Sequence, residues 1–403
     1  MQRFDERLTS RDHAQNPYPT FHLLRRHDPV YWSEPWGCWL LTRYDDIVAT
    51  LANPKQFTSV GRFTPTMSLP EPLKRQIRPL ERHYTRGLIN VDPPDHTRIR
   101  HLVQKAFSTR TVSTMADYVS DIVERLLDAV EPAGEIDVIR DLSYPLPITV
   151  IAELMGVPVT DHEKLKRWSG RIVEFMATPK PAPEVLLSSQ DALVSLQDYF
   201  KSIYKQRRVA PRNDLISMLV EVEESGDRLT EEEMVSTCVT ILIGGHETTT
   251  YLISSGMLAL MQHPDEMRKL ERRPELAAIA VEEMLRYESP FQRNRRIATE
   301  DVEVGGRRIK KGQLLVQMMG AANRDPDVFP NPDVFDIERH PNRHLSFGYG
   351  PHFCLGAPLA RLEAPIAINA MLRRLPRMEI ATDELVWNNA VFRGLQRLPV
   401  TFG

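Results

Sequence analysis

The chain has 403 residues, of which 42% are hydrophobic, and 51 Lys and Arg against 54 Asp and Glu give it a net charge of −3. This composition supports a large core, and the charge balance argues against a nucleic-acid binder. The polar N-terminus lacks a signal-peptide core, and no run of about 18 apolar residues predicts a membrane span. We therefore expect a soluble protein. Its three cysteines are few and widely spaced, which suits a reducing cytoplasm.

The first 60 residues mix short helical patterns with strand-like runs. Residues 60–95 are rich in proline and loosely patterned, which predicts a long loop, and long loops inside compact domains often have a function. Helical periodicity dominates from about 97 to 290. A break falls at residues 178–183, where three prolines make a continuous helix impossible.

The clearest helix begins at Thr230, where Thr230 and Glu233 match the capping-box pattern. It ends at His263, which precedes a proline. At about 1.5 Å per residue the helix is roughly 48 Å long, enough to cross a whole domain. Its residues are apolar nearly all round, which indicates that the helix is buried.

Strand-like segments return at residues 301–318, and a Pro- and Asp-rich loop follows at 324–343. A last helix starts after Gly356. No internal repeat or linker divides the chain. We therefore predict a single domain over residues 1–403 that is mainly α with small β-sheets.

Residues 244–249 (GGHETT) interrupt the apolar long helix with glycines and polar side chains. Paired glycines cost about 1 kcal/mol each relative to alanine, and a flat ligand passing close to the backbone at Gly244 would justify them. Glu247 and Thr248 both need partners in a buried helix. The structural alternatives are an ion pair for Glu247 and a hydrogen bond from Thr248 to the carbonyl four residues earlier.

Residues 344–356 (HLSFGYGPHFCLG) form a glycine-rich loop around Cys354. The glycines allow tight backbone geometry that a side chain would block. Cys354 lies just before the last helix, where the positive end of the helix dipole favours thiolate over thiol. The alternative for a lone cysteine is a buried, inert residue in a tight turn.

The cysteine loop resembles the haem-binding signature of the cytochrome P-450 family at every fixed position, in the pattern Phe347-Gly348-x-Gly350-x-His352-x-Cys354-x-Gly356. Thiolate ligation to haem favours O–O cleavage. Three further segments are similar to motifs of the same family, so the resemblance covers essentially the whole chain. They are residues 244–249 (oxygen-binding segment), Glu283–Arg286 with Arg339 downstream (ExxR motif), and residues 92–100 (propionate-binding segment of soluble bacterial members).

This resemblance implies a cytochrome P-450 fold, with haem b (heme b) between the long central helix and the cysteine loop. Cys354 is then the axial ligand of the iron. The cofactor-binding residues that the resemblance implies are His96, Arg100, Gly244, Arg296, Phe347, His352 and Cys354. Glu283, Arg286 and Arg339 are expected to form a buried triad that acts as scaffold, and His344 is given a structural role.

The function that the resemblance implies is hydroxylation or epoxidation of a small apolar substrate with dioxygen. A separate ferredoxin and ferredoxin reductase supply the two electrons. Thr248 then hydrogen-bonds the dioxygen, and Glu247 relays solvent protons to it. The basic residues offered for docking an acidic ferredoxin are Arg98, Lys105, Arg110, Arg343 and Arg361.

Two other functions stay open at this point, a peroxygenase fed by hydrogen peroxide and a haem sensor or carrier without turnover. The Glu247–Thr248 pair argues against both. The chain is similar to the bacterial branch that oxidises polyketides, macrolides and fatty-acyl groups, which suggests secondary-metabolite biosynthesis. The substrate is either a free small molecule or a carrier-bound acyl group. The segments expected to line its pocket are 60–90, 170–190, 290–294 and 391–395.

Strand alternation makes a finer prediction for residues 290–296. If Arg296 points to a haem propionate, Gln292 and Asn294 share its face and approach the pocket, because successive side chains point to opposite faces of a strand. Arg293 and Arg295 then point away from the pocket. Phe392 is expected to close the cavity.

Overall fold

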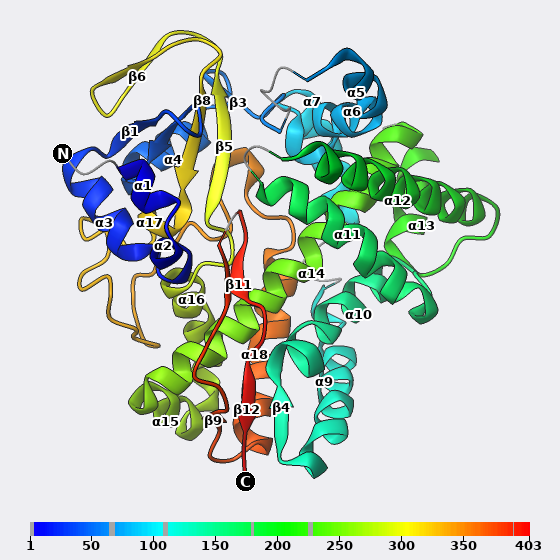
Figure 1. Cartoon of the computed structure of the whole chain (residues 1–403). Coiled ribbons are helices and arrows are strands. Elements are labelled where there is room, and N and C mark those ends of the chain that lie inside the picture. Colours follow the sequence, from blue (N-terminus) through cyan, green and yellow to red (C-terminus); the bar gives the residue numbers. More distant parts are fainter. Residues whose placement is uncertain (1–3, 64–68, 108–111, 179–180, 225–228, 390) are drawn as a thin grey trace.

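The helix expected from Thr230 is present as α14 (Glu231–Gln262) in the computed structural model. Its capping box is complete, since the Thr230 hydroxyl accepts from the Glu233 amide at 3.2 Å and the Glu233 carboxylate accepts from the Thr230 amide at 2.8 Å. Most of its side chains are buried. In Figure 1 this helix runs diagonally through the molecule, and it contacts α10, α12, α16 and α18. α14 is therefore the central element of the fold.

The structure describes residues 4–63, 69–107, 112–178, 181–224, 229–389 and 391–403. Helices predominate, as predicted. They are α1 (Phe4–Leu8), α2 (Arg11–Gln15), α3 (Tyr18–His27), α4 (Tyr44–Ala52), α5 (Glu71–Gln76), α6 (Arg78–Arg86), α7 (Asp95–Ala106), α9 (Ala116–Val130), α10 (Pro145–Leu154), α11 (His162–Ala177), α12 (Pro183–Val209), α13 (Leu215–Glu224), α14, α15 (Pro264–Arg272), α16 (Ala277–Tyr287), α17 (Met319–Ala322) and α18 (Ala357–Arg374).

The strands are short and form small sheets. They are β1 (Val30–Ser33), β2 (Cys38–Leu41), β3 (Phe57–Thr58), β4 (Glu135–Asp137), β5 (Arg293–Ala298), β6 (Val302–Val304), β7 (Arg307–Ile309), β8 (Leu314–Met318), β9 (Glu379–Ile380), β10 (Trp387–Asn389), β11 (Arg393–Leu395) and β12 (Pro399–Thr401).

The largest sheet has the order β1-β2-β8-β5-β3. β2 and β8 are parallel, and β5 pairs antiparallel with β8, with Arg296 opposite Leu315. This sheet lies beside the N-terminal helices and away from α9 and α10 (Figure 1). Residues 293–295 of β5 line the cavity described below, so the sheet positions one wall of the site.

The prediction of one long loop over residues 60–95 is wrong. Two helices, α5 and α6, occupy part of this segment, while residues 64–68 lie outside the described residues. Each helix has a proline, Pro72 or Pro79, in its first turn, where the missing N–H costs no intrahelical hydrogen bond. The prolines that suggested a loop are therefore compatible with helices.

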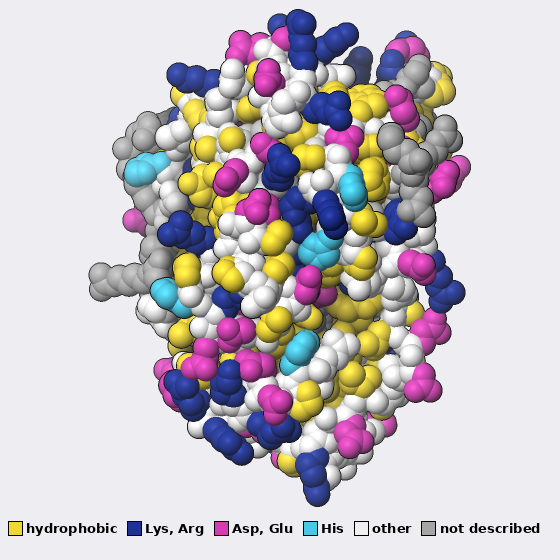
Figure 2. Space-filling model, turned by 90° about the vertical axis from the view of Figure 1, so that its left-hand side faces the viewer, with side chains coloured by type: hydrophobic (Ala, Val, Ile, Leu, Met, Phe, Trp, Pro, Cys, Tyr) yellow, Lys and Arg dark blue, Asp and Glu magenta, His cyan; other side chains and the backbone are white. Residues whose placement is uncertain are grey.

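No helix in the described ranges is long and apolar enough to cross a membrane. On the face shown in Figure 2, acidic and basic side chains are interspersed with apolar ones, so no field of one charge covers that face. The prediction that residues 1–403 form one domain stays a prediction.

Candidate active site

A cavity of about 290 Å³ lies between α14, β5 and the cysteine loop. It is lined by seven of the residues proposed from the sequence, namely His96, Arg100, Gly244, Thr248, Phe347, His352 and Cys354. Glu247 and Arg296 are not part of its lining. These seven residues come from three separate segments of the chain, so no single motif could predict that they meet around one space.

The cysteine loop is held by its glycines and by backbone hydrogen bonds within it. Gly350 has φ +69°, and a Cβ there would lie 2.8 Å from the Leu51 carbonyl oxygen, so glycine is required at this position. The Cys354 amide donates to the Phe347 carbonyl at 2.8 Å. These constraints place Cys354 directly before α18, as predicted.

Burial raises the pKa of the Cys354 thiol, while the backbone N–H groups of Gly356 and Ala357 and the charge of Arg100 lower it. The predicted contribution of the α18 N-terminus is therefore present, but burial outweighs it in the free thiol. Coordination to a metal ion deprotonates such a thiol. The sulfur is open to the cavity, so a metal ion in the cavity can reach it.

Four basic side chains gather around His352 at one side of the cavity. Burial lowers the pKa of His352, and the charges of Arg296, Arg62, His96 and Arg100 lower it further. The rings of His96 and His352 lie 4.1 Å apart. None of the three arginines forms an ion pair with an acidic residue in the described part of the chain. A cluster of this kind favours a bound anion.

Unpartnered donors in this cluster support the same conclusion. His96 Nε2, Arg62 Nε and Arg296 Nη2 are buried without a hydrogen-bond partner, and such groups are costly unless a ligand satisfies them. The donor set fits the two carboxylates of a haem, which Arg can bind in bidentate fashion. Arg62 lies in the segment 60–90 that is expected to line the pocket, but it is not predicted as a cofactor-binding residue because no motif contains it.

The mid-helix glycines have different environments. Gly244 faces the cavity, and a Cβ there would meet no atom within 4 Å, so it leaves room for a flat ligand. A Cβ on Gly245 would instead lie 2.9 Å from Ile151 of α10. The second glycine is therefore required by helix packing. Thr248 lines the cavity, and its hydroxyl donates to the Gly244 carbonyl at 3.0 Å, which is the structural alternative considered for it.

Glu247 does not line the cavity and is held by neighbouring side chains. Burial raises its pKa, but hydrogen bonds from His246 and Tyr251 and the charge of Lys166 more than offset this and leave the pKa below its ordinary value. The separation from Glu247 Oε1 to His246 Nε2 is 3.5 Å. Glu247 is therefore ionised at neutral pH and has partners, as a buried acid requires.

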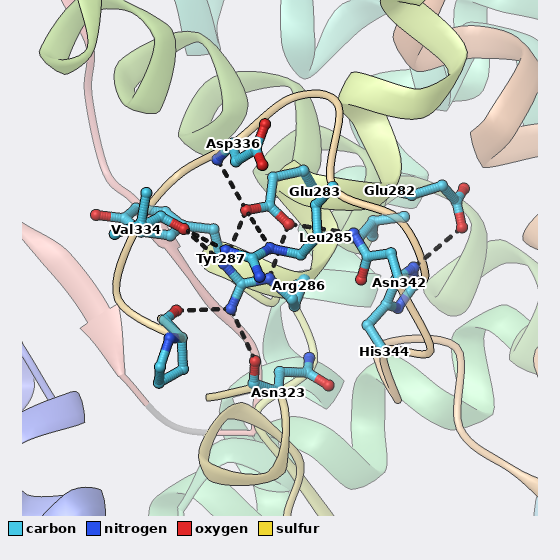
Figure 3. A network of polar contacts seen from close by, with 12 residues as sticks. Glu282, Glu283, Leu285, Arg286, Tyr287, Asn323, Val334, Asp336, Asn342 and His344 are labelled. Carbon is cyan, nitrogen blue, oxygen red and sulfur yellow. Dashed lines mark hydrogen bonds and ion pairs between the residues drawn. The ribbon is translucent and has the colours of Figure 1, made fainter. Parts of the chain in front are cut away.

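The predicted triad of Glu283, Arg286 and Arg339 is confirmed, and Figure 3 shows the contact between Glu283 and Arg286. Arg286 donates to both Glu283 oxygens at 2.7 and 2.8 Å, and Arg339 Nε donates to Glu283 at 3.1 Å. The remaining Arg286 donors reach the carbonyls of residues 323, 332 and 334. Because Glu283 and Arg286 are fully buried, this network fixes the path of residues 323–339 beneath α16.

His344 has the structural role expected of it. Its Nε2 lies 3.1 Å from Glu282, and its Nδ1 accepts from the Ser346 amide. Arg361 also pairs with Glu282, and Arg98 pairs with Glu233. Two of the basic residues offered for ferredoxin docking are thus already in ion pairs, while Arg110 and the side chain of Lys105 lie outside the described residues.

The prediction of which side chains in residues 292–296 face the pocket is partly wrong. Asn294 lines the cavity, and its amide oxygen accepts from Arg62 and Arg296, as the alternation implied. Gln292 is fully buried, donates to the Ser289 carbonyl and does not line the cavity, because β5 begins only at Arg293. Arg293 and Arg295 also line cavity surface instead of pointing away from it. Both residues line the main cavity itself and, in addition, a second cavity on the other side of the strand.

The comparisons with known proteins agree with this site. The family model "Cytochrome P450" matches residues 38–277 and 273–384. The biotin biosynthesis cytochrome P450 of Bacillus subtilis is 40% identical over 98% of this chain and 98% of its own length. The polyketide biosynthesis cytochrome P450 PksS of the same organism is 39% identical over 96% of each chain.

Among solved structures, P450BioI in complex with an acyl carrier protein ligated to hexadec-9Z-enoic acid has a TM-score of 0.90 and 40% identity, covering 98% of this chain and 100% of that one. The likeness therefore extends over sequence, fold and nearly the full length. The chain belongs to the cytochrome P450 family, whose members are monooxygenases that bind haem through a cysteine thiolate.

Proposed function

We propose that this cytochrome P450 uses dioxygen and two electrons to hydroxylate or epoxidise an apolar substrate, with a ferredoxin and a ferredoxin reductase as its electron donors. Cys354 holds the iron of haem b, and Phe347 and Gly244 border the space for the ring. His96, Arg100, Arg296 and His352, together with Arg62, hold the propionates. Thiolate-ligated haem supplies oxygen activation. The observation that carries the proposal is one cavity lined by both the cysteine sulfur and the basic residues Arg62, His96, Arg100 and His352, with buried atoms of Arg62 and His96 left without a hydrogen-bond partner among the described residues.

In this proposal two residues of α14, Thr248 and Glu247, position and transfer protons. The Thr248 hydroxyl donates its hydrogen bond to the Gly244 carbonyl. Its oxygen can therefore still accept a hydrogen bond from a donor in the cavity, such as water. Glu247 is ionised and lies one residue away, so it can take up a proton from solvent. Rotation of its side chain would then deliver that proton toward Thr248.

For the substrate we propose a fatty-acyl or polyketide chain, free or carrier-bound, in a secondary-metabolite or fatty-acid pathway. The named activities of the biotin and polyketide relatives and the acyl chain bound to P450BioI support this class. The cavity walls, which include Phe107, Ile241 and Leu252, are largely apolar and suit such a chain. The cytoplasmic location expected from the sequence stays a prediction.

Replacing Thr248 with alanine should divert most of the reducing equivalents into hydrogen peroxide. The reason is that alanine has no hydroxyl to hold a proton donor in position in the cavity. Haem content and substrate affinity should stay unchanged. The measurement is product formed per reduced cofactor consumed. Thr250 lies on the same helix and makes the same bond to the carbonyl four residues earlier, at 2.9 Å, but it does not line the cavity, so Thr250→Ala is the control and should leave this ratio unchanged. An unchanged ratio in Thr248→Ala would remove Thr248 from proton delivery.

The same assay distinguishes the proposed monooxygenase from a peroxygenase and from a haem sensor or carrier. A peroxygenase would form product with hydrogen peroxide and without reduced cofactor. A haem sensor or carrier would show no substrate-dependent consumption of reduced cofactor at all. The proposal requires that consumption to depend on both the substrate and the ferredoxin system.

A further inference from the structure

A second, smaller cavity of about 80 Å³ lies on the far side of β5 from Asn294. Its walls include Trp36 and Phe175. Four residues line both cavities, namely Arg62, Phe63, Arg293 and Arg295. The two cavities are therefore adjacent, and three arginines lie in the wall between them.

Arg295 is half-buried and, unlike two buried arginines elsewhere, is not paired with any acid that the structure describes. Arg207 pairs with Asp214, and Arg393 pairs with Glu288. Over the described ranges of the chain, Arg295 has no acidic partner within ion-pair distance. Its guanidinium lies 5.5 Å from the centre of the Phe63 ring, and burial lowers its pKa. A cation in this setting is stabilised by an anion that the protein itself does not supply.

The Tyr84 hydroxyl is a second hydrogen-bond donor without a partner in the described part of the chain, near Arg295. Its side chain is 2% exposed, and its hydroxyl has no hydrogen-bond partner. Its ring contacts Phe63 at 5.2 Å and Phe175 at 5.5 Å between ring centres, and its hydroxyl lies within electrostatic range of Arg295. Burial raises the pKa of Tyr84, so the group is an O–H donor at neutral pH.

The haem propionates do not account for these donors. Arg296 and Arg295 are adjacent on β5, and their side chains point to opposite faces of the strand. Arg296 shares its face with Asn294 and lies with the propionate cluster. Arg295 lies on the face of Phe63 and the smaller cavity. Arg295 also lines the larger cavity that contains Cys354, so it can contact a substrate there.

Resting on the proposed function, we propose that Arg295 and Tyr84 bind an oxyanion at one end of an otherwise apolar substrate. Both residues line the same cavity as Cys354, so the apolar body of the substrate extends from this end toward the haem side. A free carboxylate and the phosphate of a pantetheine arm both supply an oxyanion. A charged acceptor satisfies the Tyr84 hydroxyl and the Arg295 guanidinium together.

The experiment measures the affinity of the haem-loaded protein for three probes by calorimetry. They are hexadec-9Z-enoate, its neutral methyl ester and its phosphopantetheine thioester. The wild type should bind at least one oxyanion probe about 10–100-fold more tightly than the ester, the usual range for hydrogen bonds to a charged group. Arg295→Leu should abolish this preference with the ester affinity unchanged. Tyr84→Phe should reduce it by about tenfold, and Arg295→Lys should keep part of it.

The matched control is Arg308→Leu, since Arg308 is an exposed arginine on β7 that pairs with Asp301 and lines neither cavity. It should keep the full preference. Loss of the preference for the acid alone assigns the oxyanion to a free carboxylate, and loss for the thioester alone assigns it to the pantetheine phosphate. Equal affinity of the wild type for all three probes, or an undiminished preference in Arg295→Leu, would overturn the proposal. Binding is measured without electron donors, so failure of the proposed monooxygenase reaction is a separate result.

Discussion

Replacing Arg286 with leucine is expected to lower the free energy of unfolding by about 3–5 kcal/mol, the usual cost of breaking a buried ion pair. The substitution leaves the Glu283 carboxylate fully buried with Arg339 and Asn342 as its remaining side-chain partners. It also removes the donors of three backbone carbonyls between residues 323 and 334. A loss of this size is a large part of the stability of a typical protein. Denaturant unfolding of the purified variant measures it.

The control for this prediction is Arg273→Leu. Arg273 pairs with Glu338 and Glu275 at the surface, and exposed ion pairs contribute little to stability. Its unfolding midpoint should match the wild type. If Arg286→Leu unfolds at the same denaturant concentration as Arg273→Leu, the triad is not the scaffold described here.

Replacing Glu247 with glutamine is expected to slow turnover by about 10²–10⁴, the range for a positioned proton donor or acceptor. Glutamine keeps the shape of the side chain and part of its hydrogen bonding to His246 and Tyr251, but it cannot carry a proton. Substrate affinity and the carbon-monoxide spectrum should therefore be retained. The rate should be measured in H₂O and D₂O, because slow proton delivery enlarges the solvent isotope effect.

Glu231 provides the comparison for that prediction. It is an exposed acid in the first turn of α14, and Glu231→Gln removes the same charge from the same helix. Its turnover should equal that of the wild type. A wild-type rate in Glu247→Gln would show that protons reach the site by another route.

The features that the sequence predicted best depend on local patterns. α14 combines a capping box with a long apolar period, and the cysteine loop needs its glycines at fixed positions. The Glu283–Arg286 pair lies on one helical turn, so its spacing alone brings the two side chains together. In these segments the chemistry and the local geometry are set by neighbours in the chain.

The features that were missed depend on contacts between distant segments. α5 and α6 are short, and their prolines hid them because a proline is equally compatible with a loop and with a first helical turn. Arg62 carries no motif, and only the folded chain brings it to Asn294. The second cavity beside Arg295 is formed by β2, β5, β8 and the end of α11, so strand alternation alone could not predict it.

The absorption spectrum of the reduced, carbon-monoxide-bound protein tests the assignment of Cys354 as the haem ligand. The wild type should show the red-shifted Soret band of a thiolate haem, and Cys354→Ser should lack it. Cys38 and Cys238 are buried away from the cavity, and burial raises the pKa of each to about 12, so Cys38→Ser and Cys238→Ser should keep the band. A band that persists in Cys354→Ser, or disappears in either of the other two, would contradict the assignment.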